Sequence, residues 1–178
     1  PAGVTLSGSR RMEIIDIAQS EGILIVEDNP YGLLWFEQAP PPAMRAVSEE
    51  GIIYLGSFSK TFGPGLRVGW VVAPHGIREK LVLANEAAVL SPSSFSQLVV
   101  TDYFHRSDWK AQIDTFRGVY RERRDAMVQA LAHELPGVHH TQPTGGFYLW
   151  LTLPEGLNSK EMLPRAVTEL VAYTPGTA

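Results

Sequence analysis

The chain has 178 residues, of which 44% are hydrophobic and 19% are charged, and its formal net charge is −4. This balance supports a packed core, and the lack of a basic run makes nucleic acid a poor candidate for a partner. The sequence has no cysteine, which excludes disulfides and thiolate metal sites within it, and no apolar run of membrane-spanning length, so we expect a cytoplasmic protein with no membrane partner.

The first predicted elements follow the pattern of a sheet covered by helices. Ser7 or Ser9 is expected to cap a helix that runs to Gly22. Three short apolar runs follow, ILIVE at 23–27, IIYLG at 52–56 and VGWVVA at 68–73. Because these runs are rich in β-branched residues and lack polar alternation, we interpret them as strands buried on both faces. The pattern favours an α/β fold.

The character of the sequence changes near residue 107. Helices are predicted at 76–90 and 94–106, then a long amphipathic helix at 108–134, and an alternating strand at 145–154. Asn158 and Glu161 are spaced as the capping box of a last helix, although Pro164 favours a later start. We therefore expect a domain boundary at 105–110, which divides the chain into residues 1–107 and 108–178.

Polar side chains gather where the predicted strands end. Asp28 and Tyr31 follow the first strand, Ser57, Ser59 and Lys60 follow the second, and Arg67 precedes the third. Ligands of such sheets bind beyond the carboxyl ends of the strands. A lysine can form a Schiff base with an aldehyde, a carboxylate can hold a proton on a pyridine nitrogen, a phenol can bind a ring oxygen, and hydroxyls with a guanidinium suit a phosphate. Pyridoxal 5′-phosphate carries all four groups, so we predict it as the cofactor.

Each of these residues also has a plainer interpretation when it is taken alone. Lys60 could be a surface lysine, Asp28 a turn residue and Tyr31 a packing residue of its loop. The two serines could bond nearby backbone, and Arg67 could form a surface ion pair with Glu79 or Asp102. Two groups outside the site are interpreted structurally: His139–His140 as a strand edge rather than a metal pair, and Arg121, Arg123 and Arg124 as a solvated helix face.

The stretches EDNPYGLLWF and YLGSFSKTFGPGLRVGWVVAP resemble the fold-type I pyridoxal-phosphate enzymes, specifically the class I/II aminotransferases. The branch they resemble contains 2-aminoadipate and kynurenine aminotransferases and the aminotransferase-like domains of MocR-type regulators. TGGFYLWLTLP resembles the strand of the family's small domain. The resemblance implies the latter half of a large cofactor-binding domain, a mostly parallel sheet covered by helices, followed by part of an α+β small C-terminal domain.

The resemblance also implies a role for each site residue. Lys60 would be the Schiff-base lysine, which also moves a proton between the substrate α-carbon and the cofactor. Asp28 would pair with the pyridine nitrogen and Tyr31 with the 3′-oxygen, and the phosphate would be bound by Ser57, Ser59 and Arg67. The implied reaction is transamination between an amino acid and a 2-oxo acid, in a full-length protein that forms a homodimer.

Other functions stay open at this point. The family's glycine-rich phosphate loop and its arginine for the substrate α-carboxylate are expected outside this segment, so we expect the segment alone to be inactive. The same residues would serve an effector-sensing domain of a MocR-type transcription regulator, or a carbon–sulfur lyase of the same fold. A catalytically inactive structural piece is the remaining alternative.

Overall fold

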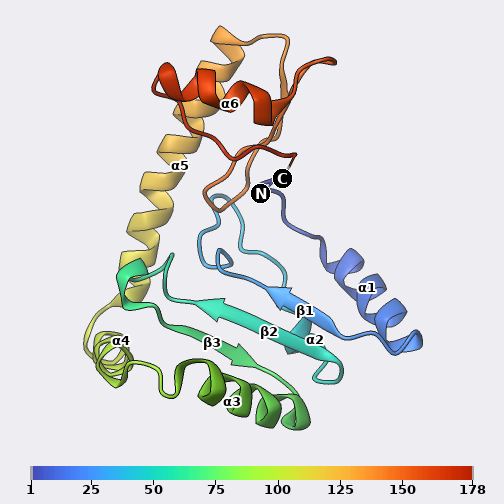
Figure 1. Ribbon diagram of the computed structural model, residues 1–178, viewed down its shortest axis with the longest axis vertical. Helices are drawn as coiled ribbons and strands as arrows, with labels where there is room; N and C mark the ends of the chain where they lie inside the picture. Colours follow the sequence, from blue (N-terminus) through green and yellow to red (C-terminus); the bar gives the residue numbers. More distant parts are fainter. Residues whose placement is uncertain (1, 178) are drawn as a thin grey trace.

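The protein is described by a computed structural model that covers residues 2–177. A small sheet lies beside a long helix that rises away from it, and a last helix crosses near the far end of that long helix (Figure 1). In chain order the elements are α1 (Gly8–Ser20), β1 (Ile25–Asp28), α2 (Met44–Val47), β2 (Ile52–Ser57), the short 3₁₀ helix η1 (Pro64–Leu66), β3 (Gly69–Val72), α3 (His75–Val89), α4 (Ser94–Arg106), α5 (Trp109–Glu134), β4 (His139–His140), β5 (Leu151–Thr152) and α6 (Ser159–Thr168).

The main sheet has the strand order β1-β2-β3. β1 and β2 are parallel, with Asp28 opposite Leu55, and β2 and β3 are antiparallel, with Ser57 opposite Gly69. Parallel neighbours end at the same edge of a sheet, and an antiparallel neighbour begins there. The pairing therefore brings the end of β1, the end of β2 and the start of β3 to one edge, as the α/β interpretation requires.

The prediction that the strands are buried on both faces is wrong for the outer strands. All four residues of β3 are exposed, and Val26 in β1 is 58% exposed. One buried cluster lies at the contact of α1, α2 and β2, where Ile15, Met44 and Ile52 pack together. Further buried hydrophobic side chains lie in the loop after β1 and in α4 and α5, namely Leu34, Phe36, Val100 and Ile113.

The helices follow the predicted pattern closely. Ser7 caps α1 by accepting a hydrogen bond from the backbone N–H of Arg10 at 3.3 Å. The expectation of a later start for α6 is wrong, because Asn158 accepts from the N–H groups of Lys160 and Glu161 and starts the helix with Pro164 inside it. None of the helices within residues 2–177 combines the length and the apolar character that crossing a bilayer needs.

The predicted strand at 145–154 is mostly absent. Only Leu151–Thr152 pairs as β5, antiparallel to His139–His140 in β4. Gly145 instead forms an isolated antiparallel bridge with Trp35, and Gly146 has a φ of 76°, which turns the chain out of a strand. The alternating pattern thus belongs to a bent segment that lies against the loop after β1.

Candidate active site

The turn that carries Lys60 is held by aromatic packing. The N–H of Phe62 donates to the carbonyl of Phe58 at 2.9 Å, which closes the turn around the half-buried Lys60. The Phe58 ring packs on Phe104 at 5.1 Å and the Phe62 ring stacks on Tyr103 at 4.1 Å, both from α4. The lysine therefore sits between two anchored rings on a short turn.

Ser57 ends β2 and organises the start of this turn. Its Oγ accepts a hydrogen bond from the N–H of Ser59 at 3.1 Å. The plainer interpretation, in which a serine bonds nearby backbone, is thus confirmed for Ser57. A hydroxyl that accepts one hydrogen bond still carries a proton that it can donate, so the contact also leaves Ser57 able to bind an anion.

Arg67 follows η1 in a backbone conformation that is unusual for its residue type. Its φ of 54° and ψ of 41° lie in the left-handed region, where a side chain with a Cβ is strained. The N–H of Phe58 donates to the carbonyl of Val68 at 3.1 Å, so Arg67 lies just beyond the β2–β3 pairing, next to the Lys60 turn. Arg67 lines a cavity of about 610 Å³ together with Ser93, which caps α4, and Ser96 of α4.

The alternative of a surface ion pair for Arg67 is wrong. Glu79 faces His75 at 3.6 Å and Asp102 binds Arg106 at 2.7 Å, so both carboxylates pair within their own helices. The Arg67 guanidinium donates instead to the carbonyl of Pro64 at 3.3 Å, while the side chain stays exposed.

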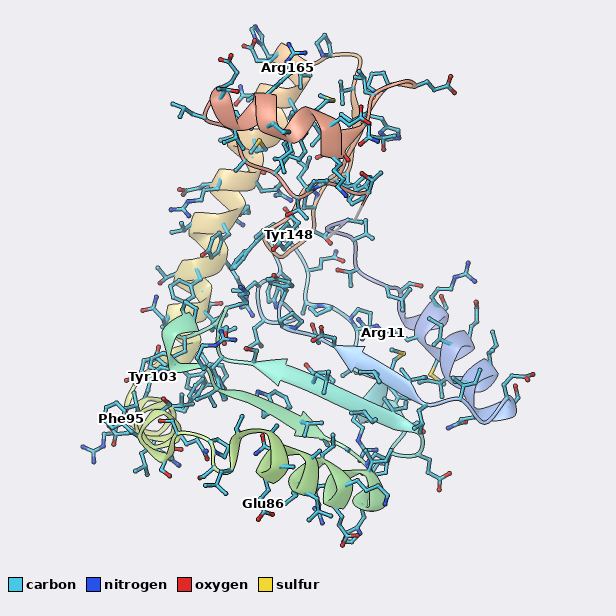
Figure 2. All side chains as sticks on the ribbon, viewed as in Figure 1. Arg11, Glu86, Phe95, Tyr103, Tyr148 and Arg165 are labelled. Carbon is cyan, nitrogen blue, oxygen red and sulfur yellow. The ribbon has the colours of Figure 1, made fainter. Side chains whose placement is uncertain are left out.

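Tyr31 lies in the loop after β1, against two aromatic rings from the bent segment. The ring centre of Tyr31 lies 5.3 Å from that of Phe147 and 6.1 Å from that of Tyr148, both in edge-to-face arrangements, and Figure 2 shows Tyr148 between the sheet and the last helix. Burial first, then the Tyr148 phenol and the negative charge of Asp28, raise the pKa of Tyr31 to about 12. The phenol therefore keeps its proton at neutral pH and can donate a hydrogen bond.

Hydrogen bonds and ring stacking of neighbouring residues fix the position of the exposed Asp28. The N–H of Asn29 donates to the carbonyl of Leu55 at 3.0 Å and continues the β1–β2 pairing by one residue. The Asn29 amide donates to the Tyr54 hydroxyl at 3.1 Å, and the Tyr54 ring stacks on Trp70 at 5.2 Å. Burial is also the main cause that raises the pKa of Tyr54.

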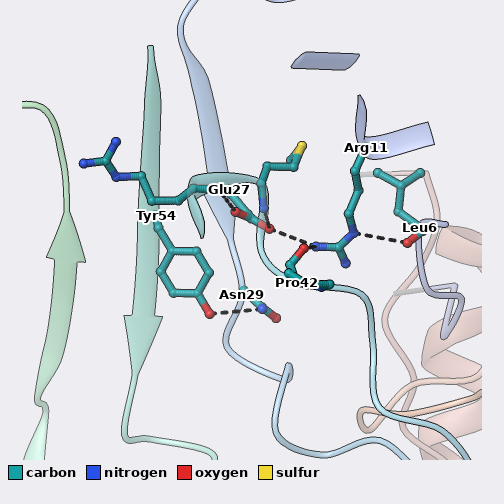
Figure 3. A network of polar contacts seen from close by, with 8 residues as sticks. Leu6, Arg11, Glu27, Asn29, Pro42 and Tyr54 are labelled. Atoms are coloured by element: carbon teal, nitrogen blue, oxygen red, sulfur yellow. Dashed lines mark hydrogen bonds and ion pairs between the residues drawn. The ribbon is translucent and has the colours of Figure 1, made fainter. Parts of the chain in front are cut away.

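The sequence interpretation missed a charged network that is centred on Glu27, the residue before Asp28. Glu27, only 8% exposed, pairs with Arg11 of α1 at 3.1 Å (Figure 3). Its carboxylate also accepts from the N–H groups of Met44 at 3.1 Å and Arg45 at 3.2 Å, so it caps α2. The available signal was the glutamate that ends an otherwise apolar strand run, because a buried carboxylate requires partners.

The structure brings the predicted residues to one edge of the sheet, but it does not gather them in one cavity. Among the cavities of residues 2–177, Tyr31 lines one of about 230 Å³, Ser57 one of about 370 Å³ and Arg67 one of about 610 Å³. No group of three metal-ligating side chains occurs within these residues, and His139–His140 forms a strand edge as predicted. The solvated-face interpretation is wrong for Arg124, which is 15% exposed and bound to Glu37.

Known proteins match this chain over nearly its whole length. Residues 1–178 match the family model "Aminotransferase class I and II". The chain is 44% identical to aromatic-amino-acid aminotransferase 1 of Thermococcus litoralis, over 100% of this chain and 43% of that protein. It is 35% identical to an uncharacterised HTH-type transcriptional regulator of Bacillus subtilis, over 99% of this chain and 37% of that protein.

A solved structure is also similar to this chain over nearly its whole length. The kynurenine aminotransferase of Pyrococcus horikoshii, in complex with PMP, superposes with a TM-score of 0.93 and 41% identity, over 99% of this chain and 44% of that one. The chain thus spans less than half the length of these relatives. The chain belongs to the class I and II aminotransferase family.

Proposed function

We propose that the chain provides the lysine-bearing part of a pyridoxal-phosphate-dependent aminotransferase, which exchanges an amino group between an amino acid and a 2-oxo acid. The observation that carries the proposal is the β1–β2–β3 pairing, which places Asp28, the Lys60 turn and Arg67 at one edge of the sheet. The P. horikoshii relative, solved with PMP, supports the choice of cofactor, since PMP is the amino form of pyridoxal phosphate.

The donor set fits this cofactor group by group. Asp28 offers a carboxylate for the pyridine N–H, and the protonated Tyr31 offers a donor for the ring oxygen. The phosphate would be bound by the hydroxyls and the guanidinium of Ser57, Ser59 and Arg67. The Lys60 amine, on its anchored turn, would react with the aldehyde.

The protein's own residues would then perform the proton chemistry. When bound, pyridoxal phosphate supplies an electron sink for the bonds at the substrate α-carbon. Asp28 would keep the ring nitrogen protonated, which that role needs. The neutral amine of Lys60 would remove the α-proton of the substrate, and the half-buried turn at 59–62 would hold the amine in place for it.

Two further proposals concern organisation. We propose that residues 1–107 belong to the large domain and residues 108–178 to the small domain, supported by the helix break at Ser107–Asp108 and by the two separate sheets. We also propose a homodimer for the full-length protein. The exposed apolar side chains of α3 and α4, including Leu83, Phe95 and Leu98, form a surface of the kind that subunit contacts bury.

Chemical trapping tests the lysine assignment directly. The purified chain is incubated with pyridoxal phosphate, treated with borohydride to make the lysine linkage permanent, and mapped by mass spectrometry. The chain has only four lysines, so the map is simple. We expect label on Lys60 and its loss in Lys60→Ala, whereas Lys80→Ala, a change at an exposed site on α3, keeps the label. Label spread evenly over the lysines of a folded chain would contradict the assignment.

The effector domain of a transcription regulator is the second candidate, favoured by the 35% identity to an HTH-type regulator along 99% of this chain. Both candidates bind the cofactor, so binding does not separate them. Turnover separates them when the full-length protein is used: it is given an amino acid and 2-oxoglutarate, and glutamate formation is measured. Repeated turnover supports the enzyme, whereas cofactor binding with no glutamate formed supports the regulator.

A further inference from the structure

Two arginines of α5 face the loop that follows the Tyr31 turn. Arg117 and Arg124 are seven positions apart, so they lie on the same face of the helix, about 20° short of two full turns. Both are largely buried, with side chains 19% and 15% exposed. Both contact residues 33–37, which we call the clamp segment.

Arg117 binds the first half of the clamp segment. Its Nε donates to the carbonyl of Leu33 at 2.8 Å, and its guanidinium lies 3.9 Å above the centre of the Trp35 ring. An ion pair with Asp114, one turn back on α5, orients the guanidinium. A flat cation over an indole ring is the strongest form of the cation–π contact, and a directional hydrogen bond fixes it here.

Arg124 binds the second half in the same way. Its guanidinium pairs with Glu37 and lies 4.9 Å from the centre of the Phe36 ring. It also pairs with Asp125 at 2.6 Å and donates to the carbonyl of Pro143. The two arginines thus repeat one arrangement, in which a polar contact and a stacked ring are used together.

The clamp segment is held on its other side as well. The N–H of Phe36 donates to the carbonyl of Thr144, and the N–H of Gly146 donates to the carbonyl of Leu34, both at 2.9 Å. Gly145 bridges Trp35, and a Cβ on it would lie 2.8 Å from the Leu34 carbonyl oxygen. Residues beyond 108 therefore bind the clamp segment through backbone contacts as well as through the two arginines.

The clamp segment is joined directly to Tyr31. The N–H of Leu34 donates to the carbonyl of Tyr31 at 2.8 Å, which closes the turn between them. The Phe147 ring contacts Tyr31 at 5.3 Å and Tyr120 of α5 at 4.3 Å. Tyr31 is thus tied to α5 through its own turn and through a shared ring.

We propose that Arg117 and Arg124 are positioning residues, which bind the clamp segment to α5 and thereby hold the Tyr31 phenol in its half-buried position. The role of Tyr31 toward the cofactor rests on the proposed function, whereas the placement of Tyr31 by the two arginines is independent of that function. The loop that carries Tyr31 is bound to α5, and the Lys60 turn is bound to α4 through its aromatic contacts. A shift of α5 against α4 would therefore change the distance between these two groups.

Nitration of tyrosine tests the placement at pH 8, where the fold is not challenged. Tetranitromethane reacts with the phenolate, so the rate follows the phenolate fraction and the exposure of each ring. Burial is the main cause of the raised Tyr31 pKa, followed by Tyr148 and Asp28, and both of these residues remain in the variants. If the Arg117→Met/Arg124→Met variant frees the loop, the Tyr31 pKa falls from about 12 toward 10.0, and nitration rises up to about 100-fold.

The controls decide between positioning and a general loss of structure. Arg121→Met changes an exposed arginine of the same helix and should leave Tyr31 nitration unchanged. Tyr173, which donates to the Ser159 carbonyl at 2.7 Å, reports on the α6 region and should also stay unchanged. Native-like Tyr31 nitration in a folded double methionine variant overturns the proposal. If that variant does not fold, Arg117→Lys/Arg124→Lys keeps the charges but loses the flat stacked fork, and native-like nitration there overturns it equally.

Cofactor binding separates this inference from the proposed function. Arg117→Met should weaken pyridoxal phosphate binding, and the weakening should vanish in a Tyr31→Phe background, since the arginine acts through the phenol. Faster nitration together with no effect of Tyr31→Phe on cofactor affinity would support the clamp and contradict the role of Tyr31 toward the cofactor. Equal weakening by Arg117→Met in both backgrounds would overturn the positioning role.

Discussion

The Arg11–Glu27 pair gives the sharpest stability prediction. Glu27→Gln keeps the volume of the side chain but removes the charge that binds Arg11 and the N–H groups of Met44 and Arg45. One partner removed from a buried ion pair costs about 3–5 kcal/mol. Arg11 retains the carbonyls of Leu6 and Pro42 as acceptors, at 3.2 Å and 3.1 Å, so we expect a value at the lower end, about 3 kcal/mol.

Urea unfolding followed by circular dichroism measures this loss. With a slope of about 2 kcal/mol per molar urea, the midpoint should fall by about 1.5 M. Glu13→Gln is the matched control, because that carboxylate pairs at the exposed surface of α1 and should cost under about 1 kcal/mol. If Glu27→Gln and Glu13→Gln shifted the midpoint equally, the reasoning that burial makes this pair important would be refuted.

Three further changes test other parts of the structure. The pKa of Tyr31 is about 12 in the folded chain and 10.0 in the unfolded chain, so Tyr31 stabilises the fold below pH 10.0 and loses this contribution as the pH rises to about 12. Between these two pH values the urea midpoint of Tyr31→Phe should therefore fall less with pH than that of the unchanged chain. Gly145→Ala pushes a Cβ to 2.8 Å from the Leu34 carbonyl oxygen and should cost about 1–3 kcal/mol, whereas Gly137→Ala, with open space around it, should be tolerated in thermal melts. Phe62→Ala removes a ring stacked on α4, so it should cost about 2 kcal/mol of stability and slow the trapping of Lys60 by borohydride. Trapping at the native rate would contradict the anchoring of the turn by this ring.

Most of the element pattern could be predicted from local signals. The helices at 76–90, 94–106 and 108–134 correspond to α3, α4 and α5, because their capping and periodicity are properties of neighbouring residues. The three apolar runs became β1, β2 and β3 for the same reason. The alternation at 145–154 predicted a strand wrongly, since Gly145 and Gly146 let the segment bend toward Trp35, a residue more than a hundred positions away.

In the candidate site too, local signals predicted the chemical groups but not the distant contacts that support them. The chemistry of Asp28, Lys60 and Arg67 could be inferred from residue type and from position at strand ends, and their roles stay predictions. What the sequence could not supply was the support behind them. Glu27 and Arg124 bind partners that are distant in the chain, Arg11 and Glu37, and no local pattern identifies those partners. Such partners become visible only once the fold brings the segments together.

The outer strand β3 has a consequence for handling the protein. Its residues Trp70, Val71 and Val72 are 43%, 38% and 43% exposed, and β3 pairs with β2 alone in the sheet of residues 2–177. An uncharged apolar strand with one open side is a template on which another chain can add a strand. The isolated chain should therefore refold with a yield that falls as its concentration rises. A lysine at position 71 should raise the yield, because a charge on an open strand disfavours the addition of a second strand.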